Sequence, residues 1–425
     1  MRRRAFLLEA GRASLGLATW RFGMPPLFVD EASADLPRGS DPLRRGGKAT
    51  GTRDGPEPLT LFLCGDVMTG RGIDQALPHP GDPILHEDYV KSARRYLELA
   101  ERANGPIPAP VGFSYVWGDA LEELDRQRPN ARVVNLETSV AAGGEPWEGK
   151  SVHYRMHPAN VPVLAAAGID CCVLANNHVL DWGYGGLEET LEALRGAGVR
   201  TAGAGSGLAE AGAPAVLEAR GRRILVFGFG SVTSGIPPGW AAAAERPGVN
   251  LLPDLSERTA RRVAAEVRRA RRAGDLVVAS IHWGGNWGYR IPDKERRFAR
   301  LLIDVGGADI VHGHSSHHAK GIEVYRERPI LYGCGDFLTD YEGIAGYEEY
   351  RDDLVLMYFV TLEPSGALAR LEMTPLRTRR FRLEWASREE AGWLRETLDR
   401  ESRALGCRVD PGEGGRLALR WDSGG

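Results

Sequence analysis

The feature of this chain that most constrains its fold is a recurring pattern in which a short apolar run ends at a polar side chain. The run at 59–64 leads into Asp66, and similar runs lead into Glu137, Asn177, His282 and His314. Short apolar runs with such boundaries are typical of buried strands. In an open α/β sheet the carboxyl ends of the strands line one crevice, where residues from distant positions meet. The pattern therefore predicts an α/β protein in which these side chains converge on a single site.

Helical periodicity alternates with the apolar runs along most of the chain. Strands are predicted at 59–64, 132–135, 171–175, 224–229, 276–281 and 310–312, and helices at 90–102, 159–167, 187–197, 256–273 and 394–405. Later runs, at 321–325, 330–332 and 354–362, predict consecutive strands with no helix between them. This succession favours α/β layers with mixed sheets over a simple doubly wound sheet.

Residues 1–58 are expected to form a disordered extension, because 29–58 is dense in proline, glycine and charge. The arginines at 2–4 and the apolar residues after them resemble a twin-arginine export signal. Charged residues at 9, 12 and 21 interrupt the apolar stretch, so a simple extension and an export signal both stay open, as do a cytoplasmic and an exported location. No later stretch approaches the roughly 20 apolar residues of a transmembrane segment.

The charge balance argues against a nucleic-acid partner. Lys+Arg 54 against Asp+Glu 57 leaves a formal net charge of −3, so the chain lacks the global basic field typical of nucleic-acid-binding proteins. The 5 cysteines include no C-x-x-C pair, which favours buried thiols over a disulfide framework.

The residue types at the predicted strand ends point to a metal site. Imidazole, carboxylate and amide groups form a mixed nitrogen and oxygen ligand set, which suits Zn, Fe, Mn or another first-row divalent ion. The segment 312–318 holds four of the 10 histidines, a density that packing does not require. Metal ligation explains this density, and an exposed polar turn is the alternative.

Several motifs occur in the order found in one known family. Gly-Asp-Val-Met at 65–68, Asn-Leu-Glu at 135–137, the segment 175–183, His-Trp-Gly at 282–284 and Gly-His-Ser-Ser-His at 313–317 resemble the CapA family, together with 203–205 and 330–337. That family is associated with poly-γ-glutamate capsule synthesis and belongs to the calcineurin-like metallophosphatase superfamily. The resemblance implies a four-layer α/β/β/α sandwich over 59–380, with a C-terminal helical extension, 381–425, packed on it.

The resemblance also implies roles for single residues. Asp66 and His317 would hold one metal ion, Asn177, His282 and His314 a second, and Glu137 would bridge the two. Met68 stands where the superfamily pattern has a histidine, and Glu137 where many relatives have aspartate, so a site with one divalent ion stays open beside a site with two. Ser315 and Ser316 also replace a His-Pro pair that is often seen in relatives.

A catalytic pair is implied beside these ligands. His178 would face the substrate as a general acid or oxyanion stabiliser, and Asp181 would orient its imidazole and support the cationic form. The alternative for Asp181 is a cap on the following helix.

Arg71, Lys150 and Arg155 lie close in sequence to these motifs and are candidates for neutralising an anionic substrate, with ordinary salt bridging as the alternative. Trp283 is a candidate wall of a substrate pocket, with packing as the alternative.

The resulting hypothesis is a metal-dependent hydrolase that uses a metal-bound hydroxide on a phosphate ester or a γ-glutamyl or amide bond. Its substrate would be a small anion or polyglutamate. The alternative is a non-catalytic, metal-containing accessory protein that binds poly-γ-glutamate. The oligomeric state stays open.

Overall fold

The structure is a computed structural model that describes residues 57–422. Residues 1–56, which include the twin-arginine-like segment, lie outside the described residues. Within the described part, the larger sheet has 10 strands, and its main path runs through β20 (Cys407–Pro411), β21 (Leu417–Trp421), β18 (Leu368–Arg379), β17 (Leu354–Leu362), β1 (Leu59–Val67), β2 (Ala131–Leu136), β5 (Cys171–Val173) and β6 (Arg200–Ala202). Two further strands pair with this path, β16 (Asp336–Leu338) with β1 and β19 (Arg382–Trp385) with β18.

The second sheet has 7 strands, in the order β11 (Leu251–Leu252), β9 (Arg222–Ser231), β12 (Leu276–His282), β13 (Ile310–His314), β15 (Arg328–Leu331) and β14 (Ile322–Tyr325), with β8 (Ala215–Ala219) paired to β9. Both sheets contain parallel and antiparallel pairs; for example, β1 is parallel to β2 and antiparallel to β17. The expected mixed α/β class is thereby confirmed. Two short two-stranded sheets join β7 (Ala204–Gly205) to β10 (Gly248–Val249) and β3 (Ser139–Val140) to β4 (Arg155–Met156).

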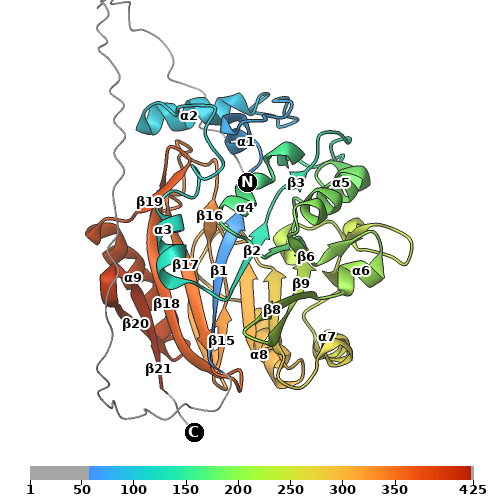
Figure 1. Cartoon of the computed structure of the whole chain (residues 1–425), viewed down its shortest axis with the longest axis vertical. Coiled ribbons are helices and arrows are strands. Elements are labelled where there is room, and N and C mark those ends of the chain that lie inside the picture. Colours follow the sequence, from blue (N-terminus) through green and yellow to red (C-terminus); the bar gives the residue numbers. More distant parts are fainter. Residues whose placement is uncertain (1–56, 423–425) are drawn as a thin grey trace, which may run out of the picture. The chain divides into compact units, whose positions relative to one another are not determined.

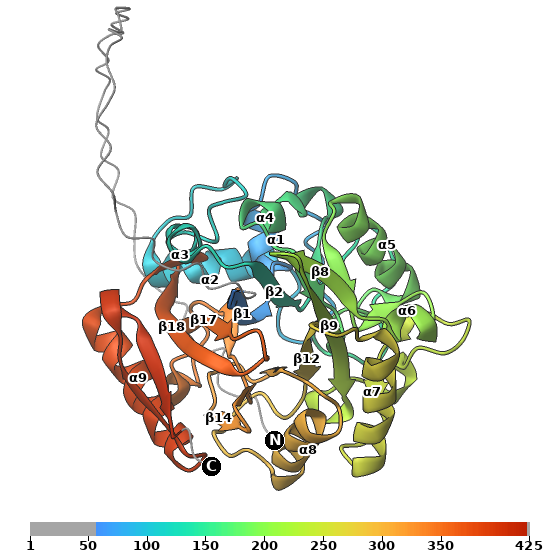
Figure 2. The same cartoon turned by 60° about the horizontal axis from the view of Figure 1, so that its bottom comes forward.

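Three large apolar clusters organise the helices around the sheets. The first joins the two sheets and includes alternate side chains of β1 together with side chains of β9, β12 and α9 (Arg388–Arg403). The second covers the other side of β1 with α1 (Gly72–Ala76), α2 (Arg94–Asn104), α3 (Ala120–Gln127), α4 (Pro162–Ala166) and α5 (Gly183–Gly196). The third packs α7 (Glu257–Ala270) and α8 (Asp293–Asp304) on the second sheet. These two helices lie side by side in Figures 1 and 2.

Local sequence explains why these elements form. In α7 the side chain of Ser256 accepts a hydrogen bond from the Thr259 backbone N–H, and the buried residues of the helix recur at the spacing of one helical face: Ala260, Val263, Ala264 and Val267. Strand β12 is rich in β-branched residues and is buried along its whole length, as expected for a parallel strand covered on both faces.

The segment 381–425 contains more than the helix expected there. Helix α9 begins with a capping box between Ser387 and Glu390. After it, β20 and β21 add two antiparallel strands to the edge of the larger sheet. Figure 1 shows α9 beside these strands. The predicted domain boundaries, 59–380 and 381–425, stay a prediction. Helix α6 (Leu208–Gly212) completes the α-helices of the described part.

Among residues 57–422, no helix combines the length and the apolar character needed to cross a bilayer.

Candidate metal centre

The polar side chains at the predicted strand ends come together at one edge of the two sheets. Asp66 of β1 lies opposite Asn135 of β2, and His282 of β12 lies opposite His314 of β13. The Asn135 Nδ2 donates to Asp66 Oδ1 at 2.7 Å, and the His282 and His314 Nδ1 atoms are 2.8 Å apart. All four side chains are buried. Strand pairing therefore places carboxylate and imidazole groups in one interior cluster.

A chain of hydrogen bonds fixes the proton on His314. The His312 Nε2 lies 2.8 Å from the carbonyl oxygen of Cys64, which can only accept, so this nitrogen carries the proton. The other nitrogen of His312 then accepts from the Ser280 hydroxyl, at 3.0 Å. The Ser280 oxygen in turn accepts from His314 Nε2 at 3.0 Å. In the neutral imidazole of His314, the lone pair is therefore on Nδ1.

His282 presents its lone pair to the same point. Its Nε2 lies 2.8 Å from Asn177 Oδ1, an acceptor, so Nε2 carries the proton and Nδ1 does not. Burial lowers the pKa of both His282 and His314 well below the usual value, so neither ring gains a second proton near neutral pH. Two lone pairs face each other across 2.8 Å, an arrangement that a bound cation would stabilise.

Carboxylates gather on the other side of this point. Burial, together with the nearby charge of Asp336, raises the pKa of Asp66 to about 7. Burial and the charge of Asp66 raise the pKa of Glu137 well above its usual value. Carboxylates that are buried together without positive partners repel each other, and a divalent cation relieves that repulsion.

The donor set therefore fits a metal ion. The described residues contain two buried groups whose ligand atoms lie within 4.8 Å of one another and can hold a metal: Asp66, His282 and His314, and Asp66, His317 and Asp336. Asn177 contacts the first group through His282. The Oε1 of Glu137 lies 3.7 Å from His282 Nε2, close to the first group but outside both.

His178 and Asp181 form a buried pair next to Glu137. The His178 Nδ1 lies 2.6 Å from Asp181 Oδ2, so Nδ1–H donates to the carboxylate and Nε2 is left as the lone pair. Nε2 faces the Glu137 Oε1 at 3.9 Å. The other oxygen of Asp181 accepts from the ammonium group of Lys150.

Burial lowers the pKa of His178 to about 4, so the imidazole is neutral near pH 7. The charge of Asp181 acts to raise this pKa, in the expected direction, but burial outweighs it. The alternative role of Asp181 as a helix cap needs correction, because Trp182 is the N-cap residue of α5 and no side chain caps that end. Asp181 instead accepts from the Tyr154 backbone N–H at 2.7 Å.

Comparison with known proteins identifies the family. The sequence matches the family described as bacterial capsule synthesis protein PGA_cap over residues 60–341. The chain belongs to this family. It is 49% identical over 357 residues to the probable polyglutamine synthesis accessory protein of Mycobacterium tuberculosis. The aligned region covers 83% of this chain and 94% of the relative.

Two more distant relatives carry the name CapA. The PGA biosynthesis protein CapA of Bacillus subtilis is 31% identical over 325 residues, 75% of this chain and 71% of the relative. The capsule biosynthesis protein CapA of Bacillus anthracis is 26% identical over 322 residues, 75% of this chain and 67% of the relative. The predicted resemblance to CapA is confirmed.

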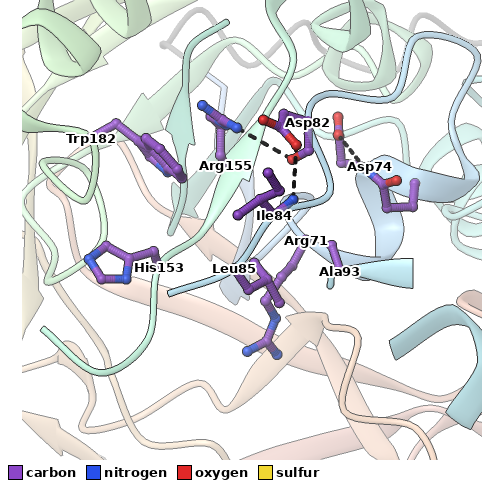
Figure 3. Close-up of a pocket in the computed structure, with 10 residues that line it drawn as sticks. Arg71, Asp74, Asp82, Ile84, Leu85, Ala93, His153, Arg155 and Trp182 are labelled. Atoms are coloured by element: carbon purple, nitrogen blue, oxygen red, sulfur yellow. Dashed lines mark hydrogen bonds between the residues drawn. The ribbon is translucent and has the colours of Figure 1, made fainter. Parts of the chain in front are cut away.

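Among the residues expected to bind substrate, Arg71 already forms ion pairs with two carboxylates of the protein. Its guanidinium is buried, pairs with Glu87 and Asp340, and lies 3.7 Å from the ring centroid of Tyr96. The salt-bridge alternative describes it, although the bridge is buried and not on the surface. The Arg155 guanidinium lies 3.6 Å from the Trp182 ring centroid and donates to the backbone oxygen of Asp82 (Figure 3). The cavity between these side chains measures about 10 Å³, the room of about one water molecule.

Lys150 and Trp283 differ in their access to the centre. The Lys150 ammonium contacts Asp181 and the backbone oxygen of Asn177, and lies 3.1 Å from His178 Nδ1. Trp283 is 1% exposed and donates from Nε1 to the Tyr332 backbone oxygen at 3.0 Å, which corresponds to the packing alternative. Of these candidates, Lys150 is the one in contact with the buried pair of His178 and Asp181.

The sequence-based prediction missed Asp336. The segment Cys334-Gly335-Asp336 repeats the segment Cys64-Gly65-Asp66, and this repetition is the signal that could have found it. A cavity of about 270 Å³ is lined in part by Tyr341. The ring centroid of Tyr341 lies 5.3 Å from that of His317.

Proposed function

We propose that this protein is a metal-dependent hydrolase that cleaves γ-glutamyl amide bonds during the synthesis of a polyglutamate polymer. The single observation that carries the proposal is the buried convergence of His282, His314 and Asp66, with two imidazole lone pairs facing each other. A purely structural core gives no reason for this arrangement. The names of the relatives, which refer to capsule, polyglutamine and PGA synthesis, support the polymer as the setting.

The same proposal covers the fold and the metal ions. The two sheets with helices on their outer faces support the four-layer α/β/β/α metallophosphatase arrangement over 59–380. The ligands would be Asp66, His282, His314 and His317, with Glu137 beside them and with Asn177, a ligand expected from the sequence, accepting from His282 Nε2–H instead. The ions would be one or two of Mn, Zn or Fe. When bound, such ions supply an electrophilic centre and lower the pKa of a water molecule.

His178 is the residue placed to move a proton. Its Nε2 lone pair is open toward Glu137, and its Nδ1–H is held by Asp181. In the neutral form favoured by its pKa of about 4, His178 accepts a proton from the attacking water at Nε2 and passes it to the leaving amine. Asp181 holds the tautomer during this cycle, and Lys150 holds Asp181.

A second function is favoured by one relative's name. The relative from Mycobacterium tuberculosis is named as an accessory protein, which suits a metal-containing protein that binds the polymer without cleaving it. Such a binder needs no proton-transfer residue, so the two functions differ in what His178 does.

The test is hydrolysis of a γ-glutamyl oligomer, with a phosphodiester as comparison substrate, by the full chain loaded with Mn²⁺ or Zn²⁺. We expect His178→Gln to lower kcat about 10²- to 10⁴-fold while the bound metal stays unchanged. Glu188→Gln, on the outer face of α5, is the control. Absence of turnover of either substrate with every metal would reject the hydrolase and leave the accessory function.

A further inference from the structure

Strand β16 brings a second carboxylate beside Asp66. β16 runs parallel to β1, with Asp336 opposite Asp66, and the Asp66 backbone N–H donates to the Gly335 oxygen at 3.0 Å. A Cβ atom on Gly65 would lie 1.6 Å from that oxygen, so only glycine permits this approach. Two aspartates on neighbouring strands are therefore held side by side in the interior.

The carboxylate of Asp336 has one oxygen without a partner. Its Oδ1 accepts from His317 Nδ1–H at 2.7 Å, and the other nitrogen of His317 lies 2.9 Å from Asn286 Nδ2, so His317 must give up the Nδ1 proton to bind an ion there. The Asp336 Oδ2 is buried and has no hydrogen-bond partner among the described residues. The residue is 2% exposed. No lysine or arginine within 57–422 forms an ion pair with Asp66 or Asp336. Because a buried carboxylate oxygen normally has a partner, this oxygen points to a bound cation.

We propose that Asp336 is a metal ligand, the third protein donor to an ion held by Asp66 and His317. The inference deepens the proposed function and rests on its metal centre. Asp66 belongs to both groups and would join this ion to the one at His282 and His314. Met68, two residues after Asp66, is buried and offers only a thioether, whose sulfur lies 3.9 Å from the Tyr341 hydroxyl.

The ligand set assigns different preferences to the two positions. Two carboxylates and one imidazole form an oxygen-rich set, which favours a hard ion such as Mn²⁺. The group at His282 and His314 has two imidazoles and one carboxylate, which suits Zn²⁺ or Fe²⁺ better. The chain should therefore bind two ions of different affinity, and Asp336 should control one of them.

The test is titration of the metal-free full chain with Mn²⁺, followed by calorimetry and by elemental analysis after desalting. We expect two equivalents for the native chain and one for Asp336→Asn and Asp336→Ala. Electron paramagnetic resonance should show coupled ions in the native chain and an isolated ion in both variants. Asp352→Asn is the matched control, because Asp352 is a half-buried carboxylate near His317 that belongs to neither group.

Each outcome decides between the proposals. Two equivalents in both Asp336 variants would overturn the assignment of Asp336 and leave the hydrolase untouched. A native chain that binds no metal and turns over no substrate would overturn both. Should neither variant fold, anomalous scattering from Mn²⁺-loaded crystals of the native chain decides: an ion further than about 2.6 Å from every Asp336 oxygen contradicts the proposal.

Discussion

Proton positions on neutral imidazoles decide which nitrogen atoms face the candidate metal centre. His314 directs Nδ1 inward because its Nε2–H is held by Ser280, and Ser280 is held in turn by His312. None of the atoms in this relay needs to touch a metal ion. The relay fixes the tautomer that a ligand must have before binding, which removes that ordering step from the binding reaction.

Ser280→Ala should weaken metal binding without removing a ligand. Loss of the hydroxyl frees His314 Nε2, so the ring can place its proton on Nδ1 and lose the inward lone pair. We expect an affinity for Zn²⁺ about 10- to 100-fold lower, measured by competition with a chelator. Ser402→Ala removes a buried hydroxyl remote from the centre and serves as the control. Equal affinity of Ser280→Ala and the native chain would contradict the relay.

At the scale of elements, the centre depends on how closely β1 and β16 approach. Gly65 lies in β1 against the backbone of Gly335, and the pairing shifts register just beyond Asp66. The approach is one of backbone against backbone, so no side-chain rotation can make room for a methyl group. The pairing of β1 with β16 therefore also places the carboxylates of Asp66 and Asp336 side by side.

Gly65→Ala should destabilise the fold severely. The new Cβ would lie 1.6 Å from the Gly335 oxygen, so β16 must move away. We expect a loss of at least about 3 kcal/mol in the free energy of unfolding, measured with urea on chelated protein. Gly185→Ala is the control, because Gly185 is exposed in α5 with no atom near its Cβ position. Gly185→Ala should raise the free energy of unfolding by about 0.5–1 kcal/mol. A native-like midpoint for Gly65→Ala would show that the two strands separate freely.

Elements differed in how far the sequence predicted them. Strands β1, β9, β12 and β17 were located by their apolar runs, and the polar residues at the ends of β1 and β12 did converge. Strand β18 was missed because its charged residues and Pro375 break the alternation that marks a strand. Strand β16 has 3 residues, too few for any periodicity. Asp336 was missed for the same reason.

Long-range partners were the other limit. The burial of Arg71 depends on Glu87 and Asp340, the second of which lies in a loop far along the chain. Local spacing contains no information on that pair, so an arginine beside a motif looked available to substrate.

Helix α2 begins at Arg94 and not near residue 90, because 90–93 pair and turn before the helix starts.

Across the whole molecule, the centre joins the two sheets. His312 of β13 donates to the Cys64 oxygen of β1 at 2.8 Å, and the Ser315 backbone N–H donates to Asp66 at 3.1 Å. The surrounding contact between the sheets is apolar. These polar links therefore set how one sheet sits on the other, and a change in the charge of His312 acts on the stability of the whole domain.

The contribution of His312 to stability should fall as the pH drops below about 6.5, whereas the raised pKa of Asp66 acts in the opposite direction. Burial lowers the pKa of His312 from 6.5 to about 4, so between these values the unfolded chain binds a proton at this residue and the folded chain does not. Folding is then opposed, by up to about 1.4 kcal/mol per pH unit from this group. The stabilisation that depends on neutral His312 is fully present above pH 6.5 and is lost progressively as the pH falls to about 4. His178, with a pKa of about 4, acts in the same direction.

His312→Gln isolates this effect. Glutamine can still donate to the Cys64 oxygen but cannot take up the proton. The free energy of unfolding of the native chain should therefore fall relative to that of His312→Gln between pH 7 and pH 5. Urea unfolding of chelated protein at several pH values measures the slope. His79→Gln, at an exposed position, is the matched control. If the native chain and His312→Gln show the same slope, His312 makes no contribution to the pH dependence of stability, and the buried link between the sheets is not what acid breaks.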